Sequence, residues 1–329
     1  MADAHAPGKL VLCGEYAVLH GAPAIAMAVP VEAHASVQPT AASRLAVAGS
    51  GEWAFEWQAD GRPRWRSEPP AGQGAVLAAV GAELASRGVR LESAAIVLDT
   101  RDFSTRLDDG TVEKLGLGSS AAVTVALVRA LLRASHAAAA SAPVLEIARA
   151  AHQRLQGGGS GIDVAVAVQG GVVAMHGDKI ESLPWPEGLH AVALWSGRSA
   201  STPDLVARFE SWRASQPDVS KRLLAAMAEA SSDTLDAWRR GHVGQILAGL
   251  ARYAELLGEL DAAARIGIIT PRHAELAREA QAVGAVYKTS GAGGGDFGIA
   301  FASRAIGDGT TFPHAGKIIL SPTSWATRP

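Results

Sequence analysis

The stretch Lys114-Leu-Gly-Leu-Gly-Ser-Ser-Ala-Ala122 joins a glycine-rich turn to an apolar segment, and it constrains the fold more than any other part of the chain. The following segment, Ala121–Leu132, is rich in Ala, Leu and Val, which predicts a buried helix. The first amides of a helix have no partner within the helix and carry the positive end of its dipole, so they attract anions. The glycines let backbone approach an anion, and the serines can cap the helix, bind phosphate or ligate Mg²⁺. An ordinary capped helix after a turn explains this one stretch equally well.

Two further glycine-rich segments favour the phosphate interpretation. They are Gly157-Gly-Gly-Ser-Gly-Ile-Asp163 and Lys288-Thr-Ser-Gly-Ala-Gly-Gly-Gly-Asp296. Glycine allows backbone amides to approach a bound anion closely, because it has no Cβ. Three such loops in one chain favour an enzyme that handles phosphate.

Neither common nucleotide-binding fingerprint fits the chain. No segment satisfies the Walker A pattern G-x-x-x-x-G-K-[S/T]. The run Gly116-x-Gly118-x-x-Ala121 matches the dinucleotide form G-x-G-x-x-A, which also needs an acidic residue about 20 positions later to bind the ribose. No Asp or Glu occurs between Ser119 and Leu145, and the turn follows a polar segment instead of a strand. A nicotinamide-binding domain is therefore disfavoured.

The composition is that of a globular protein with two cores. The chain has 329 residues, which exceeds the usual size of one domain, and 48% of them are hydrophobic while 19% are charged. A net charge of −2, without a long run of Lys or Arg, gives no reason to expect nucleic acid. The single cysteine, Cys13, excludes an internal disulfide and a cysteine-based zinc site, and its apolar neighbours predict a buried thiol.

The sequence also gives an expectation about location. The first residues lack a basic region ahead of the first apolar run, so they do not have the pattern of a signal peptide. No window reaches the roughly 18 uncharged apolar residues that a membrane span requires. We therefore expect a cytoplasmic protein without a membrane partner.

The hydrophobic pattern predicts strands and helices mixed in both halves of the chain. Strands are expected at Lys9–Cys13, Ala24–Val31, Ala33–Val47, Ala94–Leu98, Val172–Met175, Ala191–Trp195, Ala285–Lys288 and Gly298–Ala302, with a hairpin or covering loop at 50–70. Helices are expected at Gly72–Arg87, Ala121–Leu132, Pro143–Gln156, Pro203–Ala214, Ser220–Arg239, Val243–Leu260 and Pro271–Ala282. Without a regular βαβ alternation, two α+β domains fit better than a doubly wound sheet. The Pro- and Gly-rich residues 183–190 predict a boundary that gives domains 1–187 and 188–329.

Four motifs are spread over nearly the whole chain, from residue 7 to residue 296. They are Pro7-Gly8-Lys9 with Gly14-Glu15-Tyr16, Gly116-Leu-Gly-Ser-Ser-Ala-Ala122, Ser160-Gly-Ile-Asp163 and Ser290-Gly-Ala-Gly-Gly-Gly-Asp296. In this order they resemble the motif set of the GHMP small-molecule kinases. The resemblance implies an N-terminal α+β domain of ribosomal protein S5 domain 2-like fold and a ferredoxin-like α+β C-terminal domain, with ATP and Mg²⁺ bound between them.

Within this family the chain is most similar to the bacterial phosphomevalonate kinases. The segment Lys288–Asp296 resembles their K-T-S-G-A-G-G-G-D, whereas mevalonate kinases usually have glycine or another residue in place of Asp296. Gly159 stands where mevalonate kinases more often have proline, and Val112 stands where many family members have proline. This resemblance implies 5-phosphomevalonate as the acceptor.

The resemblance places Lys9 and Asp163 in the chemistry. In relatives that phosphorylate an alcohol, the matching aspartate is described as the general base and the lysine as its partner. A phosphomonoester has a second pKa near 6, so its attacking oxygen is already mostly ionised at neutral pH and no strong base is needed. We therefore expect Lys9 to draw the acceptor phosphate into line while Asp163 orients Lys9 and the substrate. The structural alternatives are a solvated surface lysine and a helix N-cap aspartate.

The resemblance also implies a set of binding residues. The turn that cradles the ATP phosphates would consist of Lys114, Gly116, Leu117, Gly118, Ser119, Ser120 and Ala121, with Ser120 as the Mg²⁺ ligand. The residues expected to bind the acceptor are Tyr16, His20, Ser160, Gly161, Arg198, Lys288, Ser290, Gly291, Ala292 and Gly293. An acceptor with a carboxylate and a phosphate needs cations, which favours Arg198 and Lys288, although a salt bridge at the rim also explains Arg198.

Two smaller expectations concern residues near these motifs. Asp296 is expected to support either Lys288 or the third glycine loop, with a turn-capping aspartate as the alternative. The histidines form no H-x-x-x-H or H-E-x-x-H pattern, so a structural or solvent-exposed role is expected for His152 and His176.

The predicted protein is an ATP- and Mg²⁺-dependent kinase that converts 5-phosphomevalonate to 5-diphosphomevalonate, as a monomer or a homodimer. One alternative is a mevalonate kinase, which would use Asp163 as a true base. Others are a diphosphomevalonate decarboxylase, whose phosphate loop usually differs from this one, and a ligand sensor on the same fold. A sensor is disfavoured because sensors tend to lose catalytic residues, whereas Lys9, Ser120 and Asp163 are all present.

Overall fold

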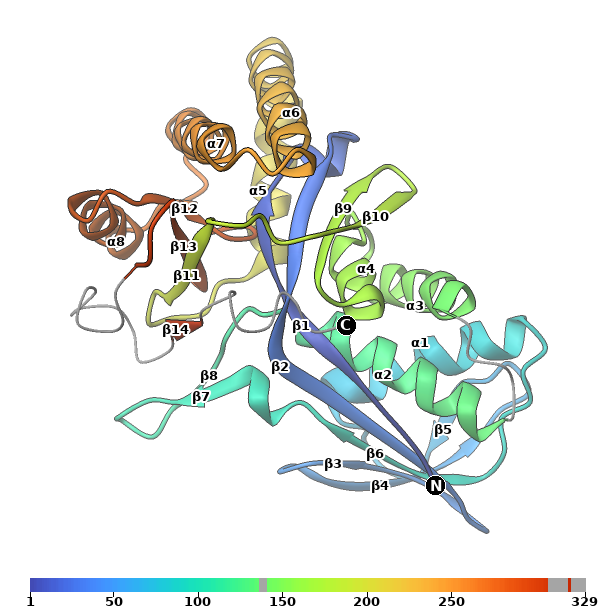
Figure 1. Cartoon of the computed structure of the whole chain (residues 1–329). Helices are drawn as coiled ribbons and strands as arrows, with labels where there is room; N and C mark the ends of the chain where they lie inside the picture. Colours follow the sequence, from blue (N-terminus) through green and yellow to red (C-terminus); the bar gives the residue numbers. More distant parts are fainter. Residues whose placement is uncertain (136–140, 307–318, 321–329) are drawn as a thin grey trace. The chain divides into compact units, whose positions relative to one another are not determined.

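The computed structural model describes residues 1–135, 141–306 and 319–320, and the chain forms two compact units. Unit 1 contains Met1–Lys9, Pro30–Ser104 and Gly118–Gly170, and unit 2 contains Leu10–Val29, Thr105–Leu117 and the residues from Gly171 onward. Each unit combines helices with strands, so the predicted α+β class is confirmed (Figure 1). The predicted boundary between residues 187 and 188 lies in a segment of unit 2, and as a domain boundary it stays a prediction.

The sheet of unit 1 is made of short strands around one long strand. The second half of β2 (Ala24–Pro39) pairs antiparallel with β6 (Ala94–Asp99), and β6 runs parallel to β3 (Ser43–Val47). β4 (Gly51–Trp57) pairs with β3 and with β5 (Pro63–Trp65), which confirms the hairpin predicted within residues 50–70. Buried and more exposed side chains alternate along β3, because one face of the sheet lies against the core.

Helices α1 (Ala71–Ser86), α2 (Ser119–Ala134), α3 (Ser141–Gln156) and α4 (Ile162–Gln169) pack against one another in unit 1. Figure 1 shows α1, α2 and α3 beside the strands of this unit. Nearly all of the apolar residues of α2 are buried, as the sequence predicts. Arg129, a half-buried polar residue of this helix, donates hydrogen bonds of 2.8 Å to the carbonyl oxygens of His5 and Val168.

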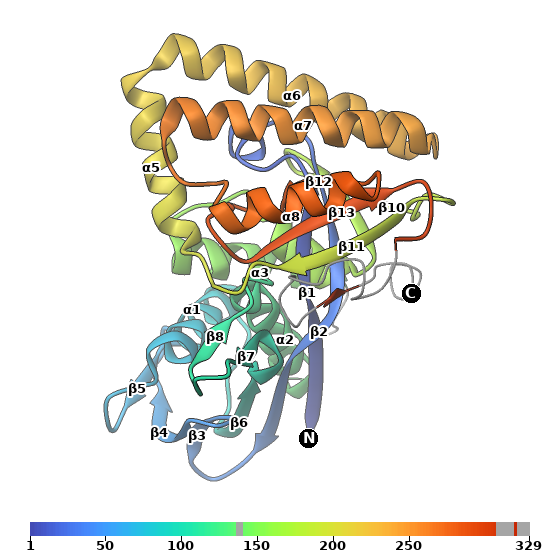
Figure 2. The same cartoon turned by 90° about the vertical axis from the view of Figure 1, so that its left-hand side faces the viewer.

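Unit 2 contains a second sheet in the order β12-β13-β11-β14. Its strands are β12 (Val286–Thr289), β13 (Phe297–Ala302), β11 (His190–Trp195) and β14 (Ile319–Leu320). Helix α8 (Pro271–Ala282) packs on this sheet, and Leu276 from the helix shares a buried core with Val192 and Tyr287 from the strands. Figure 2 shows α6 (Pro217–Arg239) and α7 (Val243–Ala264) side by side in this unit, after α5 (Thr202–Ser215).

Several strands differ from the sequence-based expectation. β1 (Ala2–Cys13) begins seven residues earlier than predicted, and β2 continues to Pro39, so the predicted strand Ala33–Val47 is divided between β2 and β3. The first half of β2 pairs with β9 (Val172–His176), which forms a hairpin with β10 (Lys179–Leu183). The pattern did not predict β10, nor β7 (Ser104–Arg106) and β8 (Val112–Lys114), because their sequences are short and polar.

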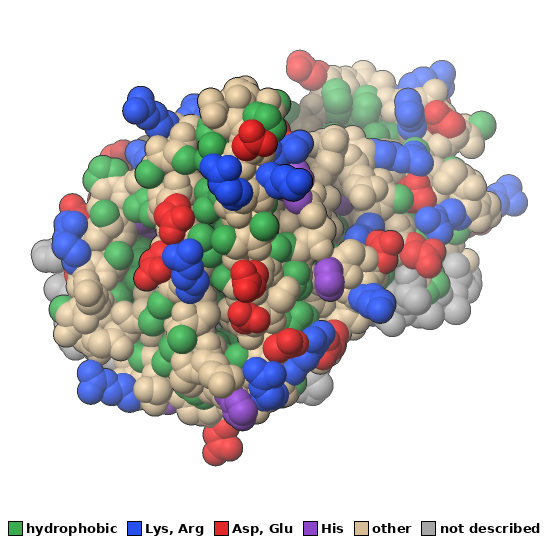
Figure 3. Space-filling view, turned by 90° about the horizontal axis from the view of Figure 1, so that it is seen from above, with side chains coloured by type: hydrophobic (Ala, Val, Ile, Leu, Met, Phe, Trp, Pro, Cys, Tyr) green, Lys and Arg blue, Asp and Glu red, His purple; other side chains and the backbone are tan. Residues whose placement is uncertain are grey.

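The surface carries both signs of charge. On the face seen in Figure 3, Lys and Arg side chains lie among Asp and Glu side chains. Arg252 on α7 illustrates this mixing, since it lies 3.0 Å from Glu255 and 3.1 Å from Glu259. In the described part of the chain, none of the helices has the length and hydropathy needed to cross a bilayer. Cys13 is buried, as predicted, and burial raises the pKa of its thiol to about 12.

Candidate active site

The predicted phosphate turn ends at Gly118, the residue that precedes α2 in unit 1. Gly118 has a left-handed conformation with φ of 80°, and no side chain of the described residues caps the helix. A residue with a Cβ would be strained in this conformation. The amides in the first turn of α2 therefore keep their hydrogen-bonding capacity, beside the half-buried residues Ser119 and Ser120. Such a helix end suits an anion.

Lys9 lies against this turn within unit 1. A Cβ built on Gly118 would be 3.1 Å from Lys9 Cγ and 3.4 Å from Lys9 Cε, so the glycine leaves the space through which the lysine stem passes. The lysine charge and the positive end of the α2 dipole repel each other, and a bound anion would offset this repulsion by attracting both. The structure thus brings together two predicted groups, Lys9 and the start of α2, in an arrangement that fits phosphate.

The other residues of the turn differ in exposure. Leu117 and Ala121 are buried, so only their main chains are suited to bind a ligand. Lys114 is exposed at the end of β8 in unit 2. Gly116, also in unit 2, has Asp296 directly beside it, because a Cβ at this glycine would lie 2.0 Å from Asp296 Cγ.

Asp163 lies in the first turn of α4, after Gly161 with φ of 76°. Its Oδ1 accepts a hydrogen bond of 2.9 Å from the amide of Val164, and its side chain is 21% exposed. We call the second glycine-rich segment, Gly157–Asp163, the middle loop. Within it, the amide of Ile162 donates a hydrogen bond of 3.4 Å to Ser160 Oγ. The carboxylate is thus held at one oxygen and remains partly accessible.

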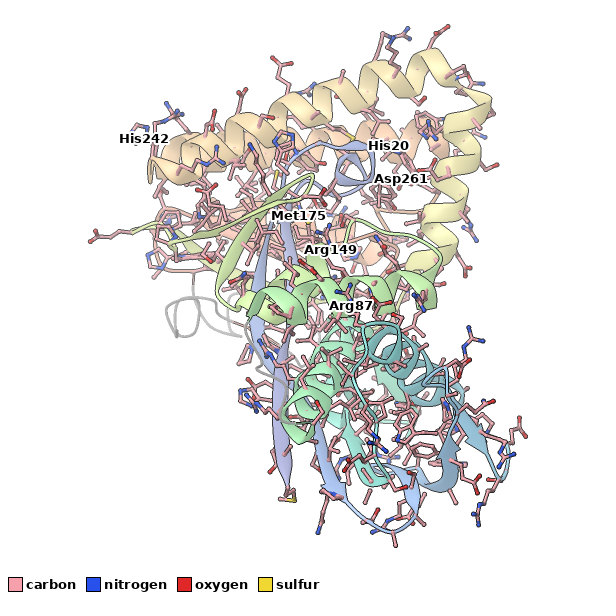
Figure 4. The ribbon with its side chains drawn as sticks, turned by 90° about the vertical axis from the view of Figure 1, so that its right-hand side faces the viewer. His20, Arg87, Arg149, Met175, His242 and Asp261 are labelled. Carbon is pink, nitrogen blue, oxygen red and sulfur yellow. The ribbon has the colours of Figure 1, made fainter. Side chains whose placement is uncertain are left out.

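Two residues of α3 lie close to the middle loop. The sequence did not mark them as site residues. His152 Nδ1 lies 3.8 Å from Asp163 Oδ2, although only a structural or solvent-exposed role was expected for this histidine. Arg149, labelled in Figure 4, comes so close to Gly161 that a Cβ there would lie 3.0 Å from Arg149 Nε. Their spacing of three residues puts both on one face of α3, but the sequence does not show that this face meets the loop.

In unit 2, the predicted substrate cation Lys288 is buried. Its ammonium donates hydrogen bonds to the carboxylate of Glu15 and, at 2.7 Å, to the carbonyl oxygen of Thr289. Burial raises the pKa of the Glu15 carboxyl, and the Lys288 charge opposes this shift. The lysine charge is therefore paired within the protein.

Three other predicted acceptor residues also use their polar groups within unit 2. Ser290 Oγ accepts from the amide of Val11 at 2.9 Å and donates to the carbonyl oxygen of Val11 at 3.0 Å. The Tyr16 hydroxyl donates to the carbonyl oxygen of Ala292 at 2.6 Å, and burial raises its pKa. His20 Nε2 lies 3.0 Å from a carboxylate oxygen of Glu210 on α5. Ser290 and Tyr16 thus join the third glycine-rich loop to Val11 and to the first motif, whereas His20 pairs with α5.

Asp296 connects the third loop with residues 196–200. Its Oδ1 accepts from the amide of Ala200 at 3.1 Å, and its own amide donates to the carbonyl oxygen of Arg198 at 2.8 Å. The Arg198 guanidinium, which is exposed, donates to the carbonyl oxygen of Gly294 at 3.2 Å. Of the two expected roles of Asp296, these contacts fit the support of the third loop.

The same loop is supported from its other side by a buried histidine. His273 Nε2 lies 2.8 Å from the carbonyl oxygen of Gly295, and its Nδ1 lies 2.7 Å from the Tyr287 hydroxyl. The neutral tautomer that satisfies both contacts has its proton on Nε2. Burial lowers the pKa of His273, which favours this neutral form.

In the described part of the chain, the carboxylates and histidines do not gather into a metal cluster. Among residues 1–135, 141–306 and 319–320, no three His, Cys, Asp or Glu side chains lie close enough together to hold a metal ion. A Mg²⁺ ion needs only one or two protein oxygens when it keeps its waters and binds phosphate. The hydroxyl of Ser120, in the first turn of α2, is a suitable ligand for an ion bound in this way.

Comparison with known proteins identifies the family. The profile of the GHMP kinases N terminal domain matches residues 76–171. The chain is 33% identical to a phosphomevalonate kinase of Streptomyces sp. (strain CL190), over 92% of this chain and 91% of that protein. The chain belongs to the GHMP kinase family. It is therefore a phosphotransferase, as its motifs predict.

More distant GHMP kinases share the fold. The chain is 28% identical to a mevalonate kinase of Pyrococcus horikoshii, over 89% of this chain and 86% of that protein. It matches the structure of Streptococcus pneumoniae phosphomevalonate kinase in complex with phosphomevalonate and AMPPNP, with a TM-score of 0.76, 22% identity and coverage of 95% and 94%. The GHMP kinase fold that the motifs imply is thus confirmed.

Proposed function

We propose that this GHMP kinase transfers a phosphoryl group from ATP to 5-phosphomevalonate, which gives 5-diphosphomevalonate. One observation carries the proposal, namely the Lys9 side chain lying against Gly118 at the uncapped start of α2. This arrangement offers the Lys9 ammonium and the first amides of α2 to phosphate groups. The Streptomyces relative supports this choice of acceptor, because it is a phosphomevalonate kinase with 33% identity.

The residues of the turn fit ATP and Mg²⁺. Bound ATP supplies the phosphoryl group, and Mg²⁺ neutralises part of the charge on its phosphates. We assign the phosphate contacts to the amides after Gly118 and the Mg²⁺ contact to the Ser120 hydroxyl. The Streptococcus pneumoniae structure contains AMPPNP, which supports ATP as the phosphoryl donor.

We propose that Lys9 acts on the acceptor phosphate. Phosphoryl transfer between two anions depends on alignment and on neutralising their repulsion, and a lysine ammonium supplies a point charge with three donors. Asp163 then orients Lys9 and the acceptor and does not remove a proton, because the attacking phosphate oxygen is mostly ionised at neutral pH.

We also assign one exposed cation of unit 2 to the recognition of an anionic group of the acceptor. The guanidinium of this residue, Arg198, suits a carboxylate or a phosphate. It donates to the carbonyl oxygen of Gly294 at 3.2 Å and has further N–H donors on the same group. Lys288, Ser290, Tyr16 and His20 have their polar groups engaged inside unit 2, and we assign them a supporting role.

The proposal is tested by ADP release from the purified protein with ATP and Mg²⁺, in parallel assays with 5-phosphomevalonate and mevalonate. We expect turnover with the phosphorylated acceptor alone. Turnover with mevalonate alone would contradict the proposal and make Asp163 a general base. If neither acceptor raises ADP release above the background, both the phosphomevalonate kinase and the mevalonate kinase assignments are contradicted.

A mevalonate kinase is the second candidate, because the Pyrococcus horikoshii relative is one. Asp163→Asn distinguishes the two chemistries. If Asp163 only orients its neighbours, the variant should keep measurable turnover with a flat profile above about pH 7. If Asp163 is a base, the variant should lose activity, and the wild type should show a steep acid limb.

A further inference from the structure

His152 has an environment that folding alone does not explain. Its side chain on α3 is 5% exposed, and its Nε2 is buried without a hydrogen-bond partner among the described residues. A buried polar atom that lacks a partner lowers the stability of the fold. An apolar side chain of similar size at this position would avoid that loss. The surroundings of the other ring nitrogen, Nδ1, suggest why an imidazole is present at this position.

That nitrogen faces the second carboxylate oxygen of Asp163, Oδ2. The amide of Val164 donates to Asp163 Oδ1 at 2.9 Å, whereas Oδ2 has His152 Nδ1 at 3.8 Å. This separation is longer than a hydrogen bond. Hydrogen bonds in active sites are often long before substrate binds and shorten in the complex.

We infer that His152 is a positioning residue for Asp163, an inference that rests on the proposed function. The tautomer with its proton on Nδ1 donates to Oδ2, while the Val164 amide fixes Oδ1. With both oxygens fixed, the carboxylate keeps one orientation when the acceptor binds. His152 itself does not touch the reacting atoms.

Two substitutions separate positioning from packing. His152→Asn keeps an N–H donor near the position of Nδ1, whereas His152→Leu removes the donor and fills similar space. We expect His152→Leu to lower kcat by about 10- to 100-fold, as for other partners of active-site side chains, with KM for the acceptor nearly unchanged. His152→Asn should retain most of the wild-type kcat. His152→Leu should melt no lower than the wild type, because it removes the unpaired Nε2.

A double-mutant cycle tests whether the effect passes through Asp163. In the Asp163→Asn background, His152→Leu should cause little further loss of kcat. Equal kcat in the wild type and His152→Leu would overturn the inference, as would equal losses in His152→Leu and His152→Asn, or a full additional loss in the Asp163→Asn background.

A measurement without an acceptor separates this inference from the proposed function. In ¹⁵N NMR spectra of the wild-type protein, we expect the His152 Nδ1 resonance to move in Asp163→Asn much more than the Nε2 resonance does. An Nδ1 resonance that does not respond to Asp163→Asn would overturn the inference. If the wild type turns over neither acceptor while Nδ1 responds, the proposed function fails and the contact between the two side chains stands.

Discussion

The glycine-rich loops at residues 114–122 and 288–296 look alike in sequence and differ in surroundings. At Gly118, the missing Cβ leaves room for the Lys9 side chain, and the helix amides that follow are uncapped. In the third loop, a Cβ on Gly294 would lie 2.9 Å from Leu205 Cδ1, and a Cβ on Gly295 would lie 2.9 Å from the carbonyl oxygen of Arg198. Gly118 of the first loop leaves space for the stem of Lys9, whereas Gly294 and Gly295 of the third loop leave space for the packing of unit 2.

This contrast shows what a run of glycines indicates. It predicts that something approaches the backbone closely, but it does not say whether that is a ligand or another part of the chain. Substitution of Gly118 in the first loop should therefore lower activity more than stability. Substitutions in the third loop should lower stability first.

The largest effect is expected for Lys9→Met. The variant keeps an unbranched side chain over Gly118 but loses the cation, so kcat/KM should fall by about 10²- to 10³-fold, as when a charge-stabilising donor is removed. Steady-state ADP release measures this change. The matched control is Lys179→Met, on β10, which should behave as the wild type. A Lys9→Met enzyme within about twofold of wild-type activity would rule out the assigned role.

A smaller loss of activity is expected for Gly118→Ala. The new Cβ needs a left-handed backbone and presses on the Lys9 stem, and a displacement of about 1 Å in an active site can cost on the order of 10²-fold in rate. Gly88→Ala is the control, because Gly88 has φ of 76° and no atom within 4 Å of an added Cβ. The comparison of kcat in the two variants isolates the contact with Lys9, and equal activities would count against it.

The third loop should respond in the opposite way. Gly294→Ala places a Cβ against Leu205 and should lower the free energy of unfolding by about 1–3 kcal/mol, in addition to backbone strain. Gly241→Ala supplies the strain alone, since Gly241 has φ of 67° and open space around it. Urea unfolding curves measure the difference. If Gly294→Ala unfolds like Gly241→Ala but loses activity, the two loops do not differ as described.

The smallest effect concerns the pH dependence of stability. Burial lowers the pKa of His273 below its usual 6.5, so below that pH the unfolded chain binds a proton that the folded chain excludes. The free energy of unfolding should then fall as pH decreases, by at most about 1.4 kcal/mol per pH unit from this group. His273→Gln, compared by urea unfolding between pH 5 and 7, should have a smaller slope. An unchanged slope would show that His273 does not titrate this way.

The local patterns predicted most of the helices well. The apolar residues of Val243–Leu260 and the proline at 271 gave α7 and α8 nearly their observed limits. The strands were harder, because the early residues of β1 alternate small apolar and polar side chains too weakly to mark a strand. Which strands pair, such as the parallel pair β3 and β6, depends on contacts that no local pattern contains.

The candidate site also has features that the sequence predicted and features that it did not. The motifs predicted the family, which the comparisons confirm. The helix predicted over Ala121–Leu132 is α2, which begins two residues earlier, at Ser119. The burial of Lys288 could not be predicted, since its partner Glu15 is 273 residues away in the sequence. The contact between His152 and Asp163 depends on the packing of α3 against α4, which the spacing of residues in α3 does not reveal.

The choice between 5-phosphomevalonate and mevalonate as the acceptor is tested by identifying the bond that the enzyme forms. Purified protein with ATP and Mg²⁺ is given equal amounts of mevalonate and 5-phosphomevalonate in one reaction, and the products are followed by ³¹P NMR. We expect a new pair of coupled diphosphate resonances besides those of ADP, with mevalonate left unchanged. A new phosphomonoester formed from mevalonate, with 5-phosphomevalonate left unconsumed, would contradict it.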